Sequence, residues 1–316
     1  MPLGKVRLLG YFIAEGSLTG STPGFTNTDP EILADFHDQV GELFPTLKVR
    51  RNDITYYPSG RRGDPSNPLT VWLRELGLMG KLSADKRFPD CVWRWDRERL
   101  REFVRVLMGC DGTVYSMSGY PRIEFAVASE GLAQDMHHAL VRFGIVAKLW
   151  KKKDRCWRVE ITEPKSVARY QSAIGWIGEK SARFTGEVSP RRSNVGHLPK
   201  EIWSDVRVAA EQRGLTLMDV ARRDGERHAE ERGYNPHTSR GLPQTRLAAY
   251  AEVLDDIALR QFASNDIYWD EVVSIECTGE HQVYDLTVPE THNFVAQDIL
   301  VHNTSLALNI ALHAAL

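Results

Sequence analysis

Two acidic residues stand at equivalent places in a repeated pattern. Glu15 closes the apolar run VRLLGYFIAEG and Asp111 closes LREFVRVLMGCDG, and a glycine follows each acid. Both runs predict helices, and glycine is favoured just past a helix end because it enters the left-handed conformation freely. If the helices pair in parallel, two carboxylates meet at the negative ends of two helix dipoles. The pattern therefore predicts a bound divalent cation, Mg²⁺, held by Glu15 and Asp111 beside a phosphate group of the substrate.

The elements that must bring these acids together form a duplicated set. After each acid comes a strand-like stretch, then a helix (residues 30–44 and 129–144), then a basic strand (residues 47–57 and 147–161). Two copies of this order predict a pseudo-twofold α/β (α+β) unit, with repeats at about 5–95 and 96–180.

Basic side chains gather on the later strands of each repeat. Alternate side chains of an antiparallel sheet face the same way, so such strands can lie in a DNA groove and contact phosphates or guanines. The formal net charge is −2, but nucleic-acid binding needs only a local basic face. The predicted partner is double-stranded DNA, and the predicted contacts are Arg50, Arg51, Lys151, Lys152, Lys153 and Arg155.

The two acidic runs resemble the paired motifs of LAGLIDADG homing endonucleases. LLGYFIAEG (residues 8–16) is similar to the first motif and VRVLMGCDG (residues 104–112) to the second. The resemblance implies αββαββα repeats, a saddle of strands in the major groove, and acids that bind metal beside the scissile phosphates. GKLSADKRFPD (residues 80–90) resembles the family's K-R-I-P segment, which implies that Lys86 orients the attacking water or stabilises charge on the phosphate.

The second motif departs from the family pattern. Gly10 and Ala14 leave one stripe of the first helix nearly bare, so a partner helix can approach closely. Val106 stands where the family usually has glycine, and Met108-Gly109-Cys110 replaces a more usual apolar-Asp-Ala. A bulkier helix crossing is therefore expected to shift Asp111 and weaken cleavage, and a DNA-binding protein without cleavage is the first alternative.

The segment from about residue 199 turns helical and strongly charged. Two interpretations stay open for it. In a helix-turn-helix, Gly214 makes the turn and a later helix beginning at Pro243 lies on DNA. In the other interpretation the segment is a helical linker or bundle.

The end of the chain carries a different chemistry. Residues 271–303 predict β-strands by their alternation and β-branched side chains. The side-chain amide of Asn303 can attack its own backbone carbonyl, form a succinimide and break the chain after itself. His302 can donate to that carbonyl, and the Thr304 hydroxyl can accept an acyl group from upstream.

VYDLTVPETHNFVAQDILVHN (residues 283–303) resembles the two C-terminal splicing blocks of inteins. The resemblance implies that Asp285 and His292 are the supporting acid and base, His302 the penultimate histidine, Asn303 the cyclising residue and Thr304 the first residue of the host protein. Residues 304–316 then resemble the helix after the phosphate loop of a DnaB-type replicative helicase. A protein-splicing element of such a helicase is therefore the second alternative.

Composition sets the class of protein and the boundaries. Hydrophobic content of 42% and charge of 26% are typical of a folded soluble chain, and no secretory or membrane segment is found in the sequence. The four cysteines lack C-x-x-C spacing, which argues against zinc.

We expect a cytoplasmic, monomeric endonuclease whose N-terminal splicing segment is missing, so that the chain stays intact after Asn303. The expected segments are an endonuclease domain (1–185), a helical insert (186–265), a partial β-rich Hint-type splicing segment (266–303) and a helicase fragment (304–316).

Overall fold

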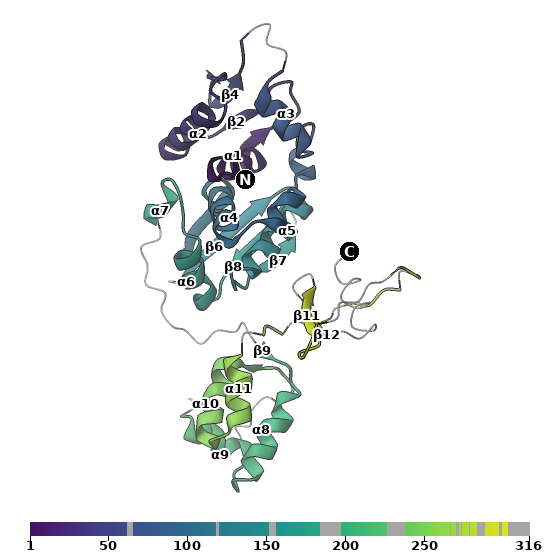
Figure 1. The fold of residues 1–316 in the computed structure, drawn as a ribbon. Helices are drawn as coiled ribbons and strands as arrows, with labels where there is room; N and C mark the ends of the chain where they lie inside the picture. Colours follow the sequence, from purple (N-terminus) through teal and green to yellow (C-terminus); the bar gives the residue numbers. More distant parts are fainter. Residues whose placement is uncertain are drawn as a thin grey trace. The chain divides into compact units, whose positions relative to one another are not determined.

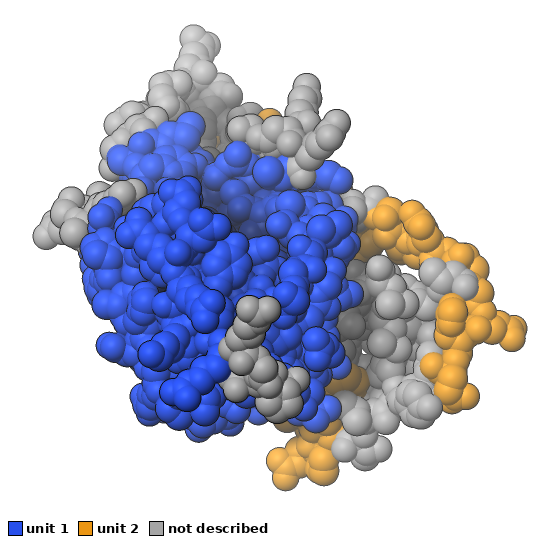
Figure 2. Space-filling model, turned by 90° about the horizontal axis from the view of Figure 1, so that it is seen from above, with its two compact units in different colours: residues 1–190, 295–300 blue, residues 191–294, 301–316 orange. Residues whose placement is uncertain are grey.

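The computed structural model resolves two compact units, which Figure 2 colours separately. Unit 1 comprises residues 1–190 and 295–300, and unit 2 comprises residues 191–294 and 301–316. Each unit has its own hydrophobic core. The structure describes residues 1–61, 66–117, 120–151, 156–183, 197–225 and 238–265, and shorter stretches between 267 and 302.

The first repeat of unit 1 is an αββαββ arrangement (Figure 1). It runs through α1 Leu3–Glu15, β1 Gly16–Ser17, β2 Gly24–Thr26, α2 Pro30–Leu43, β3 Lys48–Asn52 and β4 Thr55–Ser59. The antiparallel sheet has the strand order β1-β2-β4-β3. A further helix, α3 (Pro68–Glu75), and two 3-10 turns, η1 (Ser83–Asp85) and η2 (Asp90–Arg94), lead to the second repeat.

The second repeat follows the same order. It runs through α4 Arg97–Asp111, β5 Gly112–Met117, β6 Tyr120–Val127, α5 Glu130–Val141, β7 Lys148–Lys151 and β8 Trp157–Ile161, and is followed by α6 Pro164–Ala173 and α7 Lys180–Arg183. Its antiparallel sheet has the order β5-β6-β8-β7, which matches the first sheet strand for strand. The predicted pseudo-twofold pair of repeats is confirmed.

Capped N-termini define where the main helices begin. Asp29, Asn67, Asp96 and Ser129 each accept hydrogen bonds from the first free backbone N–H groups of α2, α3, α4 and α5. These residue types are the preferred N-caps because their short side chains satisfy donors that the helix leaves unpaired. Proline follows Asp29 and Asn67 at the first helical position, where its missing N–H costs nothing.

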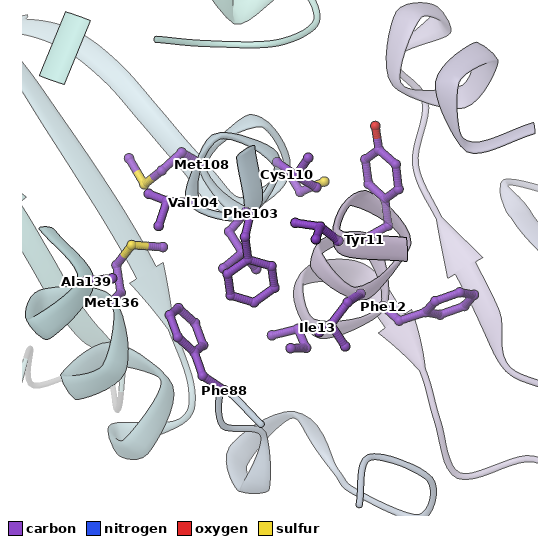
Figure 3. Packing of buried hydrophobic residues seen from close by; sticks show 14 of the residues in the cluster. Tyr11, Phe12, Ile13, Phe88, Phe103, Val104, Met108, Cys110, Met136 and Ala139 are labelled. Carbon is purple, nitrogen blue, oxygen red and sulfur yellow. The ribbon is translucent and has the colours of Figure 1, made fainter. Parts of the chain in front are cut away.

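Helices α1 and α4 pack side by side in the middle of unit 1 (Figures 1 and 3) and make the most extensive contact between any two described elements. A Cβ built on Gly10 would lie 2.7 Å from Cγ1 of Val106, so the glycine leaves the space that the valine fills. The larger residue in the second motif is thereby accommodated by the smaller one in the first. Phe88, Phe103 and Met136 close the core on the side of the second repeat.

The glycines after the two acids are not left-handed, so that expectation was wrong. Gly16 has a φ of −81° and Gly112 a φ of −77°, both in the extended region. A Cβ at Gly16 would lie 2.2 Å from the carbonyl oxygen of Phe12, and one at Gly112 would lie 2.5 Å from that of Met108. Glycine is required here because the chain turns from helix to strand against the last helical turn.

Unit 2 is mainly helical. It contains β9 His197–Leu198, α8 Ile202–Glu211, α9 Leu217–Arg223, β10 Leu242–Pro243, α10 Gln244–Leu254 and α11 Ile257–Ser264. Gly214 lies in the turn between α8 and α9 with a φ of +65°, and Thr216 and Asp219 form a capping box at the start of α9. The helix predicted from Pro243 is α10. A helix-turn-helix that contacts DNA remains a prediction.

Among the described residues of the C-terminal segment, β11 (Asn293–Ala296) and β12 (Ile299–His302) form a two-stranded sheet. Upstream of it, the described residues between 272 and 292 are not in strands, so the β-strands expected from residue 271 onward are not formed at those positions. Val272 and Ile275 are exposed there. Within the described residues, helices are too short or too polar to cross a membrane.

Candidate active site

The two predicted acids lie at the C-terminal ends of α1 and α4, on one side of unit 1. Glu15 ends α1 and Asp111 ends α4, and each is half-buried. A cavity of about 740 Å³ opens at these helix ends, and its lining includes Glu15, Lys86, Cys110 and Lys180. Packing of α1 against α4 therefore brings together residues that the sequence separates by about a hundred positions.

Lys86 lies over the end of α1. Its Nζ donates to the backbone carbonyls of Phe12 (3.2 Å), Ala14 (3.3 Å) and Gly16 (2.9 Å). Only 3% of the residue is exposed. A lysine is suited to this position because its three donors meet carbonyls that the helix end leaves unpaired. The structure thus brings Lys86 to the helix end that carries Glu15, whereas its predicted catalytic role remains a prediction.

A second lysine, Lys180, occupies the matching place on α4 and was not predicted. Its Nζ donates to the carbonyl of Cys110 at 2.6 Å. Cys110 precedes Asp111 as Ala14 precedes Glu15. The sequence held a signal for it, because Lys86 follows Ala14 by 72 residues and Lys180 follows Cys110 by 70.

Asn27 is a second residue that the sequence did not reveal. Its Nδ2 donates to Glu15 Oε2 at 2.6 Å, and its Oδ1 accepts from the backbone N–H of Asp29 at 2.8 Å. The amide therefore fixes the orientation of one carboxylate oxygen of Glu15. Glu15 is also among the residues that line the cavity.

Burial and neighbouring charges shift the pKa values of these groups. Burial, and then the nearby Glu15 charge, raise the pKa of Asp111 to about 7. Burial also raises the pKa of Glu15, although the Asn27 hydrogen bond and the two lysines oppose the shift. Burial lowers the pKa of Lys86 to about 8, against the attraction of Asp111 and Glu15. The ends of α1 and α4 thus hold like charges that an added cation would relieve.

The donor set suits one kind of metal. Among the described residues, no group of three or more His, Cys, Asp or Glu side chains is placed to hold an ion. Glu15 and Asp111 supply two carboxylates, and Mg²⁺ commonly takes one or two carboxylates with water and substrate phosphate as its remaining ligands. Burial raises the pKa of both carboxylates, and the Glu15 charge adds to the shift at Asp111. The residues present therefore fit a hard divalent ion shared with a phosphate.

Strand geometry divides the predicted DNA contacts in the first sheet. Val49 packs on the core, so Lys48 and Arg50 face the opposite side of β3, where both are exposed. Arg51 alternates to the side of Val49, donates to the Asp53 carbonyl and lies 5.8 Å from the ring of Tyr56. Both arginines are exposed, but Arg50 lies on the outer face and Arg51 lies on the face of Val49, beside Tyr56 and Asp53.

The second sheet repeats this division. Leu149 of β7 packs on the core, and Lys151 lies 5.1 Å from the ring of Trp157. The outer face carries Lys148 and Trp150 instead. Of the remaining predicted contacts, Lys152, Lys153 and Arg155 lie outside the described residues.

Ion pairs on the outer face of the second sheet were also missed. Arg122 pairs with Glu160 at 2.9 Å, Arg158 pairs with Glu124, and the Tyr115 hydroxyl donates to Glu160 at 3.2 Å. The register places Glu124 opposite Glu160 across β6 and β8. Both glutamates are buried and each is bound by an arginine, so these pairs tie β6 to β8 on this face of the sheet.

The splicing residues are only partly described. His292 is exposed, with a φ of +52°, and precedes β11. The backbone of His302 ends β12, and its side chain lies outside the described residues, as do Asp285, Asn303 and Thr304. The roles predicted for these residues remain predictions.

Comparison with known proteins gives one family and several relatives. A family model described as the intein splicing domain matches residues 97–303. The chain is 31% identical over 324 residues to a protein named replicative DNA helicase DnaB from Rhodothermus marinus, with 95% of this chain and 34% of the relative covered. It is 30% identical over 327 residues to the protein of that name from Synechocystis sp., with 95% and 37% covered. The chain spans about a third of the length of these curated relatives.

A solved structure described as I-DmoI in complex with DNA and Mn is similar in part. The similarity covers 55% of this chain and 96% of that chain, at 12% identity and a TM-score of 0.40. The pseudo-twofold relation of the repeats follows from the matching strand orders of the two sheets.

Proposed function

The chain belongs to the intein splicing domain family, and from that premise we propose that unit 1 is a site-specific endonuclease that cuts both strands of duplex DNA. One observation carries the proposal: each of two neighbouring helices ends in a carboxylate, and a lysine from a distant segment binds the carbonyl just before that carboxylate. The two matched sites are related by a pseudo-twofold axis. The two antiparallel strands of duplex DNA are also related by a twofold axis, so each site can act on one strand.

The proposed segments follow the sequence. Residues 1–185 form the endonuclease domain, 186–265 a helical insert, 266–303 the splicing segment and 304–316 the start of the flanking host protein. Because two similar proteins are named replicative helicases, the proposed target is a helicase gene that lacks the intein insertion.

Glu15 and Asp111 would hold the divalent ion, which as a Lewis acid supplies polarisation of the phosphoryl oxygen. Lys86 and Lys180 stabilise negative charge that develops on the phosphate, or orient the attacking water, on their respective sides. Asn27 keeps Glu15 in one orientation. Burial at the helix ends strengthens these interactions, because charges act further in a medium of low dielectric constant.

DNA contact is proposed for the outer faces of the two sheets. Lys48 and Arg50 supply positive charge from β3, and Lys148 supplies it from β7. The Arg122–Glu160 and Arg158–Glu124 pairs contact base edges. The same face thus combines attraction to phosphates with selection of sequence.

The C-terminal segment is proposed to perform the last step of protein splicing. Asn303 cyclises and breaks the chain after itself, His302 donates to the carbonyl under attack, and Thr304 accepts the acyl group. Asp285 and His292 act as the supporting acid and base. The family match carries this proposal, because it runs through to Asn303.

A plasmid assay tests the endonuclease. Supercoiled plasmid carrying the uninterrupted helicase gene is incubated with the purified chain and Mg²⁺, Mn²⁺ or EDTA. Linear product is expected with either metal and none with EDTA, and the same plasmid with the insertion present should stay intact. If neither nicked nor linear plasmid forms with either metal, the chain does not cut this site, and the endonuclease proposal is wrong.

A further inference from the structure

Asp29 performs two tasks with its two carboxylate oxygens. Oδ1 accepts from the backbone N–H groups of Glu31 (2.9 Å) and Ile32 (3.2 Å), which caps α2 in the first repeat. Oδ2 accepts from the backbone N–H of Glu179 at 2.7 Å. Glu179 directly precedes Lys180, so a helix cap of the first repeat holds the chain that carries the lysine of the second.

Gly178 makes this approach close enough. Its φ is +69°, and a Cβ built on it would lie 2.2 Å from Asp29 Oδ2. Any other residue would be strained in this conformation and would also push the carboxylate away. The segment before Lys180 is therefore shaped to receive Asp29.

Ser129 is the counterpart in the second repeat. Its Oγ accepts from the backbone N–H of Leu132 at 3.1 Å, which caps α5, and donates to the backbone carbonyl of Lys86 at 2.7 Å. The side chain is 1% exposed. Asp135 of α5 adds a second hold, because it accepts from the backbone N–H of Phe88 at 2.8 Å.

The two lysines are thus held in a crossed manner. Lys86 reaches with its side chain to the end of α1 in the first repeat, and its backbone is held by α5 of the second repeat. Lys180 reaches to the end of α4 in the second repeat, and its segment is held by α2 of the first. Each active half therefore depends on a helix cap in the opposite repeat.

We propose that Asp29 and Ser129 are positioning residues, each of which caps its own helix and sets the lysine beside the acid of the opposite repeat. The predicted change in DNA cleavage rests on the proposed function. The predicted change in the positions of the two lysines does not. Asp29 governs Lys180 and the strand cut at Asp111. Ser129 governs Lys86 and the strand cut at Glu15.

Two variants separate the two tasks of Asp29. In Asp29→Asn, Oδ1 still caps α2, since asparagine caps as well as aspartate, but an NH₂ group replaces the acceptor that faces Glu179. Asp29→Ser also keeps a capping oxygen and is too short to reach Glu179. Asn67→Ala is the matched control, because it removes the cap of α3 and contacts neither lysine segment.

Lysine labelling tests the positioning without any DNA. The full chain and each variant are acylated briefly at one pH, and labelling of each lysine is followed by mass spectrometry. In both Asp29 variants the labelling rate of Lys180 should rise about tenfold, the factor that corresponds to losing one hydrogen bond to a charged group, with Lys86 unchanged. Ser129→Ala should raise Lys86 selectively, and Ser129→Thr should restore the original rate. Unchanged labelling of Lys180 in both Asp29 variants overturns the proposal.

Strand-resolved cleavage tests the consequence. Glu15→Gln and Asp111→Asn first identify which strand each acid cuts. In single turnovers, Asp29→Asn should then slow only the strand assigned to Asp111, by roughly 10- to 100-fold as for a displaced catalytic group, at unchanged DNA affinity. Ser129→Ala should slow only the other strand, and Asn67→Ala neither. Equal slowing of both strands, or slowing of the strand in the same repeat, contradicts the crossed arrangement. The two proposals can fail separately. If the variants change lysine labelling selectively but the wild-type chain cuts no DNA, the endonuclease proposal is wrong and the positioning of the lysines still stands.

Discussion

Val106 of α4 lies in the space that Gly10 leaves on α1, and a Cβ on Gly10 would approach Val106 Cγ1 to 2.7 Å. Gly10 and Val106 occupy the same position in the two motifs. The valine side chain fits there because Gly10 has no side chain. This contact sets how closely the helix ends, and hence the two acids, come together.

Gly10→Ala should therefore destabilise unit 1 by about 1–3 kcal/mol, the usual cost of overpacking a core. Val106→Ala added to it should recover part of the loss, because the two residues share one space and their effects are not additive. Chemical denaturation of the two single variants and the double variant measures this. Additive losses would mean that the helices do not meet through this pair.

Glu15→Gln and Asp111→Asn should each abolish double-strand cleavage while DNA affinity remains largely intact. The amides lose the negative charge that a divalent ion requires, whereas phosphate contacts come from the basic strands. Plasmid cleavage and a gel-shift titration measure the two effects. Linear product from the doubly substituted protein would remove both residues from the site.

The stability of the metal-free protein should fall as pH rises from about 4 to about 7. Folding raises the pKa of Asp111 from 3.8 to about 7, so its stabilising contribution is present below 3.8 and is lost as pH rises through 7. Lys86, whose pKa is lowered to about 8, is protonated in the folded and the unfolded protein over this window and adds no slope there. Thermal unfolding at a series of pH values should show the decline, and Asp111→Asn should flatten it. Affinity for Mg²⁺ should rise over the same window, because the ion needs the ionised carboxylate.

DNA affinity should fall steeply with salt. A plot of log affinity against log salt concentration should have a slope of roughly −0.9 for each phosphate contact. Arg50→Ala should reduce that slope by about one contact, because Arg50 lies on the exposed outer face of β3. Arg51→Ala, the matched control, should change it less, since Arg51 lies against Tyr56 and Asp53. Fluorescence titration at several salt concentrations distinguishes them, and identical slopes would count against the strand-face assignment.

Asn303→Ala should block C-terminal cleavage under conditions in which the unsubstituted splicing segment releases residues 304–316. The side chain of alanine has no nitrogen to attack the backbone carbonyl, so no succinimide can form. His302→Ala should slow release without abolishing it, because it removes a donor and leaves the nucleophile. Intact-mass spectrometry follows both. Release of residues 304–316 from Asn303→Ala would show that the bond breaks by another route.

The sequence alone determined the features that repeat along the chain. Glu15 and Asp111 were predicted as site residues because each ends an apolar helical run before a glycine, and the two sheets because the same order of strands and helices recurs. Lys86 was predicted through its motif. Such signals are local, since helix ends, strand alternation and short motifs depend on neighbouring residues.

The tertiary structure decided what depends on distant residues. Asp29 and Glu179 are 150 positions apart, and no local pattern relates an N-cap in one repeat to the lysine of the other. Alternation against the core decided that Arg50 lies on the face of β3 opposite Val49 and Arg51 on the same face as Val49, since only packing shows which side Val49 takes. The shifted pKa values of Asp111 and Lys86 arise from burial and from charges on other elements. These properties exist only once α1 and α4 have packed, because burial and charge proximity belong to the assembled core and not to either segment.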